Sequence, residues 1–192
     1  KGLEPGALAV LEDGERRVLG LVTVNSSSRI VCRMIDRDPA AVIDEAWFVA
    51  RLQRALALRE TLFDAPYYRL VHAEADGLPG VVIDRFGTAA VIQPNAAWSE
   101  TLIGPLSAAL AKVTGVTTII RNGMGRARTL EGLPEELTVL QGAMEAPVAV
   151  PMNGATYMAD LLGGQKTGLF FDQRPNHCLL YTSPSPRDRT RS

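Results

Sequence analysis

The chain has 192 residues, of which 46% are hydrophobic and 21% are charged, and its formal net charge at pH 7 is -1. This composition provides for one sizeable core or two small ones, and it excludes collagen-like and wholly disordered classes. No run of about 18 apolar residues occurs, so no membrane-spanning helix is expected.

The first 37 residues predict short strands. Stretches 7–11, 17–25 and 29–35 are rich in β-branched residues and are separated by turn-forming residues. Three strands without a helix indicate part of a small barrel or an open sheet. Cys32 lies in the third strand and is expected to be an ordinary buried thiol. With Cys178 it forms neither a CxxC motif nor a Cys/His cluster, which argues against a zinc site and fits a reducing, cytoplasmic compartment.

Asp38-Pro39 marks a boundary, and residues 44–63 predict a helix. Phe48, Leu52 and Leu56 recur there at helical spacing. Arg51 and Arg54 fall on the opposite face of this helix, and we expect that face to be solvated.

A second unit of strands and helices follows. The sequence predicts strands at 67–73, 80–87, 89–93 and 116–122, and a helix over 96–113 that is kinked or started late by Pro105. Residues 123–133 predict a basic loop. Residues 146–162 predict a hairpin that turns at Asn153-Gly154. The order shows no regular βαβ alternation, and the fold class predicted is α+β.

Two stretches carry candidate chemistry. GGQKTG, residues 163–168, is similar to a phosphate-binding P-loop, but Gln165 stands where that motif has glycine. His72, Glu74 and Asp76 alternate and would share one face of a strand, as metal ligands or acid–base groups do. The alternative, which we prefer, is that these acids bond backbone amides in the following turn.

The stretches RLVHAEADGLPGVVIDRFG, RTLEGL and GGQKTGLFFDQRPN together resemble the 23S rRNA cytosine-C5 methyltransferases, which use S-adenosylmethionine (SAM), and the first and last of the three are the specific ones. The resemblance covers nearly all of residues 1–177. It implies a truncated PUA-like RNA-binding barrel at 1–37, a linker helix and central α+β domain at 38–146, and the opening hairpin of a Rossmann-like methyltransferase domain at 147–177. Residues 178–192 are expected to be a non-native tail, the alternative being a disordered basic tail.

The same resemblance implies that the last of these stretches lies beside the cofactor. Its amide, acidic and basic side chains suit the ammonium and carboxylate of SAM or an RNA phosphate. The alternative for its last residues is a structural ion pair between Asp172 and Arg174. The candidate cofactor-binding residues are Gln165, Lys166, Thr167, Phe171, Asp172, Gln173 and Arg174.

The family's glycine-rich cofactor loop and nucleophilic cysteine have no match in this sequence. We therefore expect a parent enzyme that acts on ribosomal RNA, and a chain that is inactive by itself. A stand-alone PUA-like RNA-binding adaptor is the alternative, and a nucleotide-hydrolysing domain is a third. Arg29 and Arg33, placed on one face of a strand, are the candidate RNA-binding residues.

Overall fold

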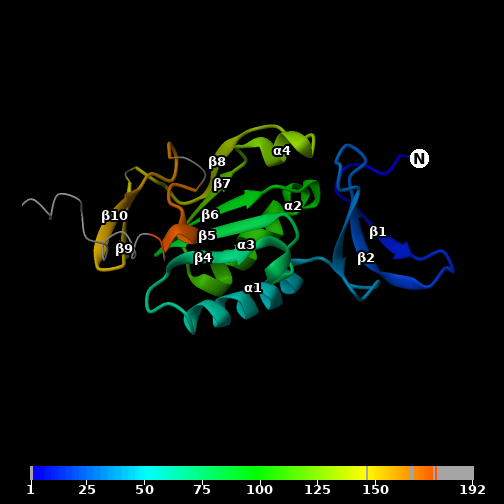
Figure 1. The fold of residues 1–192 in the computed structure, drawn as a ribbon, viewed down its shortest axis with the longest axis horizontal. Helices are drawn as coiled ribbons and strands as arrows, with labels where there is room; N and C mark the ends of the chain where they lie inside the picture. The colour runs from blue at the N-terminus through cyan, green and yellow to red at the C-terminus, as the bar shows by residue number, and fades with distance from the viewer. Residues whose placement is uncertain (1, 146, 165–166, 175, 177–192) are drawn as a thin grey trace, which may run out of the picture.

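The computed structural model describes residues 2–145, 147–164, 167–174 and 176. Its first part is an antiparallel sheet in the order β1-β2-β3, made of Ala7–Glu12, Val18–Val24 and Cys32–Asp36. The three predicted strands are confirmed. The sheet is open within the described residues, so a PUA-like barrel stays a prediction. Figure 1 shows this sheet at one end of the molecule, beside the main body.

Helix α1, Glu45–Glu60, confirms the predicted helix and ends three residues earlier than expected. It begins at Asp44, whose Oδ1 accepts a hydrogen bond of 2.9 Å from the amide of Trp47. The expectation for Arg51 was wrong. Its guanidinium lies 3.4 Å from the centre of the Trp47 ring and pairs with Asp36, whereas Arg54 is exposed as expected.

The main body is a five-stranded sheet in the order β4-β5-β6-β7-β8. Neighbouring strands are antiparallel except β6 and β7, which are parallel. The crossover between these two strands carries two helices, because the predicted helix breaks at Leu102. Pro105 lies in the first turn of the second helix, where a missing amide proton is tolerated. The elements are β4 Tyr67–His72, β5 Val81–Phe86, β6 Ala89–Pro94, α2 Ala97–Thr101, α3 Ile103–Thr114, β7 Thr118–Asn122 and β8 Leu137–Gln141.

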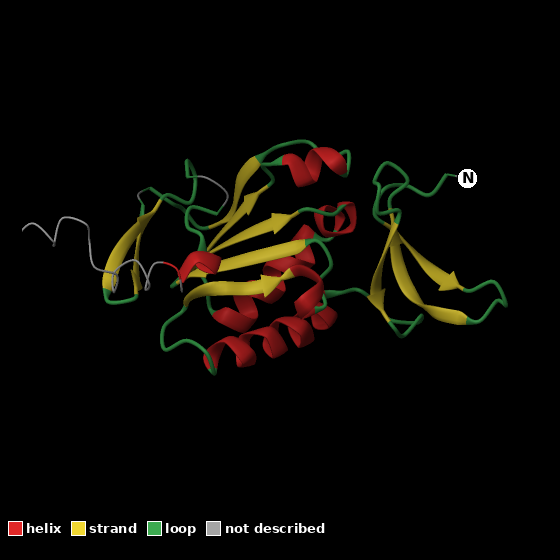
Figure 2. Ribbon diagram, in the orientation of Figure 1, coloured by secondary structure: helices red, strands yellow, loops and turns green. Residues whose placement is uncertain are grey.

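Both faces of the five-stranded sheet are buried. Helices α1 and α3 pack on one face, as Figure 2 shows, and form the larger core. The hairpin of β9, Val148–Met152, and β10, Ala155–Ala159, packs on the other face through a second core. Val91 and Ile92 are both fully buried, each in a different core, because successive strand residues point to opposite faces.

The hairpin turns at the predicted residues. Asn153 and Gly154 have φ values of 54° and 76°, the left-handed pair of a two-residue turn that matches strand twist. The predicted basic loop instead contains a short helix, α4, Arg126–Leu130. No helix within the described residues has both the length and the apolar character to cross a membrane.

Candidate functional site

The described residues of the segment 163–176 follow β10, and Phe171 packs in the core on the sheet face opposite the helices. Gln165 and Lys166, two of the predicted cofactor-binding residues, lie outside the described residues. Phe171 opens the 3-10 helix η2, Phe171–Gln173, and its ring centre lies 5.1 Å from that of Phe86 in β5. Its side chain is therefore part of the second core and holds the segment on the sheet.

A buried carboxylate joins this segment to the central sheet. Asp84 in β5 has no exposed surface, and it pairs across the sheet with Arg69 in β4. Arg69 donates to both Asp84 oxygens, from Nε at 2.9 Å and from Nη2 at 3.1 Å. The hydroxyl of Thr167 donates to Oδ2 of Asp84 at 2.6 Å. Thr167 is itself fully buried, so in this structure its hydroxyl holds the segment in place.

The Asp84 carboxylate also affects the charge of Arg69. The hydrogen bonds from Arg69 to Asp84 raise the pKa of that guanidinium above its ordinary value, against the opposing effect of burial. Nearby negative charge on Asp84 and then on Asp172 adds to the same direction. Arg69 is thus a permanently charged partner that makes burial of Asp84 tolerable.

Arg174 lies at the end of the segment, beside the loop between α1 and β4. Its Nη2 donates to the backbone oxygen of Tyr67 at 2.8 Å, and its guanidinium lies 4.7 Å from the centre of the Phe63 ring. The Nε atom is buried without a hydrogen-bond partner, and burial lowers the pKa of this guanidinium. No ion pair joins Arg174 to Asp172, although the structure describes both, so the structural ion pair considered from the sequence does not form.

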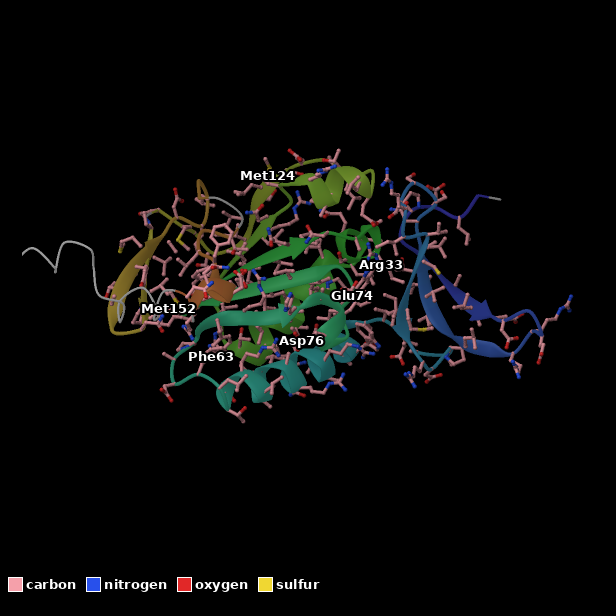
Figure 3. All side chains as sticks on the ribbon, viewed as in Figure 1. Arg33, Phe63, Glu74, Asp76, Met124 and Met152 are labelled. Carbon is pink, nitrogen blue, oxygen red and sulfur yellow. The ribbon has the colours of Figure 1, made fainter. Side chains whose placement is uncertain are left out.

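A pocket of about 320 Å³ opens beside Arg174. It lies between the α1–β4 loop and the β9–β10 turn, and Figure 3 labels two of the residues around it, Phe63 and Met152. The remaining residues around it are Leu62, Asp64, Ala65, Pro151, Asn153 and Arg174. Arg174 forms no ion pair with a described residue, and a guanidinium at a pocket of mixed polar and apolar side chains can bind a ligand carboxylate or phosphate.

Two further predicted cofactor-binding residues directly precede Arg174 and are not among the residues around the pocket. The Asp172 side chain is exposed. The Oε1 of Gln173 accepts a hydrogen bond of 2.8 Å from the side-chain amide of Asn176. Of the predicted residues that the structure describes, Arg174 lines the pocket, whereas Thr167 and Phe171 are turned toward the protein.

The two predicted RNA-binding arginines differ in their surroundings. Arg29 is exposed, but it lies in the bend before β3 and does not share a strand face with Arg33, so that expectation was wrong. Arg33 lies on β3 with its side chain 17% exposed, and it pairs with Glu131 at 2.9 Å and Glu74 at 3.2 Å. Figure 3 shows Arg33 and Glu74 facing each other between the two sheets.

The stretch from His72 to Asp76 is not a strand with three aligned ligands. Residues Ala73–Asp76 form the 3-10 helix η1, and Asp76 pairs with Arg59 at 2.7 Å. Asp76 also accepts a hydrogen bond of 2.6 Å from the backbone amide of His72, as the preferred interpretation expects of an acid here, but that amide precedes the turn and Glu74 pairs with Arg33 instead. No group of three potential metal ligands occurs in the part of the chain that the structure describes. Cys32 is exposed, contrary to expectation.

Three functional-looking charges were not predicted from the sequence: Asp84, Arg128 and Glu131, all buried. Asp84 had a signal, because it is an acid inside the apolar run VVIDRF. Arg128 and Glu131 lie in RTLEGL, one of the stretches that resemble the family, but no role followed from it, since most of their partners lie far away in the sequence.

The chain is similar in sequence to known methyltransferases, although no family model matches it. It is 33% identical over 184 residues to "Ribosomal RNA large subunit methyltransferase" of Deinococcus radiodurans, covering 90% of this chain and 45% of that protein. It is 36% identical over 178 residues to "Ribosomal RNA large subunit methyltransferase I" of Shewanella amazonensis, covering 88% of this chain and 43% of the relative.

Solved structures share the fold. A protein of Streptococcus mutans assigned as a SAM-dependent methyltransferase superposes with a TM-score of 0.79 at 18% identity, over 94% of this chain and 46% of that one. A methyltransferase solved with SAH gives 0.76 at 20% identity, over 92% and 45%. The predicted resemblance is therefore confirmed: the chain is related to the large-subunit ribosomal RNA methyltransferases. It spans a little under half the length of the curated relatives described here.

Proposed function

We propose that this chain is part of a SAM-dependent 23S rRNA methyltransferase that acts on C5 of a cytosine in the cytoplasm. The observation that carries the proposal is the sequence similarity to large-subunit rRNA methyltransferases over nine-tenths of the chain. The site supports it, because the segment that resembles the family is held on the sheet by Asp84 and Phe171 with Arg174 at a pocket.

In this proposal Arg174, whose side chain lines the pocket, binds the carboxylate of the cofactor's methionine part through its guanidinium. The exposed Asp172 and the Gln173 amide meet the ammonium group. Gln165 and Lys166 are proposed to complete the set from outside the described residues. SAM supplies an electrophilic methyl group when bound. Thr167 and Phe171 act indirectly, because they hold the segment at the sheet.

The cytosine-C5 reaction needs a cysteine thiolate that adds to C6 of the base and makes C5 nucleophilic. Among the described residues the free cysteine is Cys32, on β3. Figure 1 places that sheet (blue) at the opposite end of the molecule from η2 (orange). We therefore propose that Cys32 is not the nucleophile and that the 192-residue chain by itself transfers no methyl group.

Ribosomal RNA is the proposed partner. Arg29 is exposed and is proposed to contact an RNA phosphate, together with Arg33 to the extent that its two carboxylate partners allow. The truncated PUA-like barrel remains part of this proposal, with the open sheet β1-β2-β3 as its described portion.

The test compares the 192-residue chain with the product of the uninterrupted reading frame. Each is incubated with unmodified 23S rRNA and SAM labelled in the methyl group, and the RNA is digested to nucleosides. Label in 5-methylcytidine with the longer protein, and none with the chain, is the expected result. Label in another nucleoside would refute cytosine-C5 chemistry, no label would refute the rRNA methyltransferase, and label with the chain would refute its inactivity.

A variant pair tests the proposed role of Arg174 in the longer protein. Arg174→Met is expected to raise the KM for SAM by about tenfold or more, the effect of losing one charge-assisted hydrogen bond. Arg54→Met, which changes an exposed arginine of α1, is the matched control and should leave that KM unchanged. An unchanged KM for Arg174→Met would remove this residue from the cofactor site.

A further inference from the structure

The N-terminal part contacts the main body at several places, among them Gly6 against Ala97 and Trp98, and at two of these places a carboxylate makes the contact. The first lies beside the connecting segment 37–44. Here Asp36, the last residue of β3, accepts hydrogen bonds from Trp47 Nε1 at 2.8 Å and from Arg51 Nη2 at 2.7 Å. Leu21 and Ile35 pack into the larger core at the same end. These contacts adjoin the chain connection. They therefore hold the N-terminal sheet to the main body, but they restrict less its rotation about the connecting segment.

The second place is centred on Glu131, which directly follows α4. Its Oε1 accepts hydrogen bonds from Ser28 Oγ at 2.6 Å and from Arg33 Nη2 at 2.9 Å. Asn25 Nδ2 donates to Oε2 at 3.0 Å and to the Glu131 backbone oxygen at 2.9 Å. All of these donors belong to residues 25–33. Glu131 therefore holds one end of the N-terminal sheet by hydrogen bonds.

The Glu131 side chain is 5% exposed, and it is charged. Burial pushes the pKa of this carboxyl upward, but the hydrogen bonds from Ser28, Arg33 and Asn25 outweigh it and hold the pKa below its usual value. Arg33 is the charged group that faces Glu131, and Glu74 in turn pairs with Arg33. The carboxylate form is therefore the one that the N-terminal sheet binds.

Glu131 is itself held firmly to the main body. Arg128, three residues earlier, is fully buried and donates to the backbone oxygens of Pro94 at 2.6 Å and Pro134 at 2.8 Å. It also pairs with Glu100 of α2 at 2.6 Å. The end of β6, α2 and α4 are thus joined, and Glu131 projects from a rigid support.

We propose that Glu131 is a positioning residue that fixes the N-terminal sheet at one angle to the five-stranded sheet. Both contacts include directional hydrogen bonds to a carboxylate, but those of Asp36 adjoin the chain connection, whereas those of Glu131 hold residues 25–33, away from it. Glu131 therefore restricts the rotation that the contact at Asp36 leaves open. Resting on the proposed function, the consequence is that Glu131 sets where RNA held by the N-terminal sheet meets the segment of Arg174. Arg33 then acts mainly in this joint.

The test measures the distance between the two parts in the 192-residue chain. Nitroxide labels are placed at Glu15→Cys, in the exposed β1–β2 turn, and Glu60→Cys, at the exposed end of α1, in a Cys32→Ser, Cys178→Ser background. Pulsed electron paramagnetic resonance should give one narrow distance distribution. With Glu131→Ala the distribution should become about twofold broader or split, as a second orientation becomes populated.

Glu135→Gln is the matched control, because Glu135 is an exposed acid four residues further on and should leave the distribution narrow. Arg33→Met removes the charged donor to Glu131 that lies on the N-terminal sheet. It should broaden the distance distribution as Glu131→Ala does. Far-UV circular dichroism reports whether each variant remains folded, because both tryptophans, Trp47 and Trp98, lie near the contacts under test. Narrow, unshifted distributions in both joint variants would overturn the proposal, as would broadening only where circular dichroism shows unfolding. The measurement involves neither RNA nor cofactor. Its outcome is therefore independent of the outcome of the methyltransferase assay.

Discussion

Replacing Asp84 by asparagine is expected to destabilise the fold by about 3 kcal/mol. The substitution removes the charge that accepts three hydrogen bonds, two from Arg69 and one from Thr167. Loss of one partner from a buried ion pair costs about 3–5 kcal/mol, and the lower end applies because the Arg69 side chain is 24% exposed. Against a total stability of about 5–15 kcal/mol, this is a large fraction.

Equilibrium unfolding in urea, followed by Trp98 fluorescence, measures this loss. Asp172→Asn is the matched control, because Asp172 is exposed and has no ion pair, and its change should stay within about 0.5 kcal/mol. A double-mutant cycle with Thr167→Val isolates the contact between the segment and the sheet. We expect a coupling of about 1.5–3 kcal/mol, as for other hydrogen bonds to a charged group. A loss below about 1 kcal/mol for Asp84→Asn, or no coupling to Thr167, would refute the reasoning.

Three further changes probe other parts of the structure. Phe171→Ala removes a ring packed on Phe86 and should cost about 3 kcal/mol by thermal unfolding; a change under about 1 kcal/mol would contradict its place in the core. Arg128→Lys cannot reproduce the fork of donors to Pro94 and Pro134, and should lower the urea midpoint clearly, whereas Arg126→Lys, on the exposed start of α4, should not. Because the folded-state pKa of Glu131 is lowered from its usual value, its contribution is present at pH 7 and is lost as the pH falls through that lowered pKa. The label distance distribution should therefore stay narrow at pH 7 and broaden only at a pH below the usual pKa of a glutamate, and broadening that begins above that usual pKa would contradict the sign of the shift.

Local patterns were sufficient to predict most of the elements. The helix over α1 followed from the spacing of Phe48, Leu52 and Leu56, which is a feature of neighbouring residues. The hairpin followed from Asn153-Gly154, since that pair favours left-handed φ values. The helix α4 was not predicted, because its apolar content is low and a buried arginine, Arg128, holds it in place.

The site was predictable only in its outline. The sequence indicated which segment matters, but it did not show that Thr167 faces Asp84, 83 residues earlier. It also did not show that Arg33 faces Glu131, 98 residues later, and so treated Arg33 as free for RNA. The spacing of residues along the chain does not show which distant charges pair. For that reason Arg51 was also expected on a solvent-exposed face, although it stacks on Trp47.

The bond between Thr167 and Asp84 has a consequence for the order of folding. A ribosome releases the chain from its N-terminus, so β4 and β5 leave it well before the segment that ends at Arg174. Asp84 and Arg69 can pair as soon as those strands meet, and the oxygen that later receives Thr167 is then already in position. The segment of Thr167 thus packs on strands that have already paired. An error in the pairing of β4 and β5 would displace the Asp84 carboxylate that accepts its hydrogen bond.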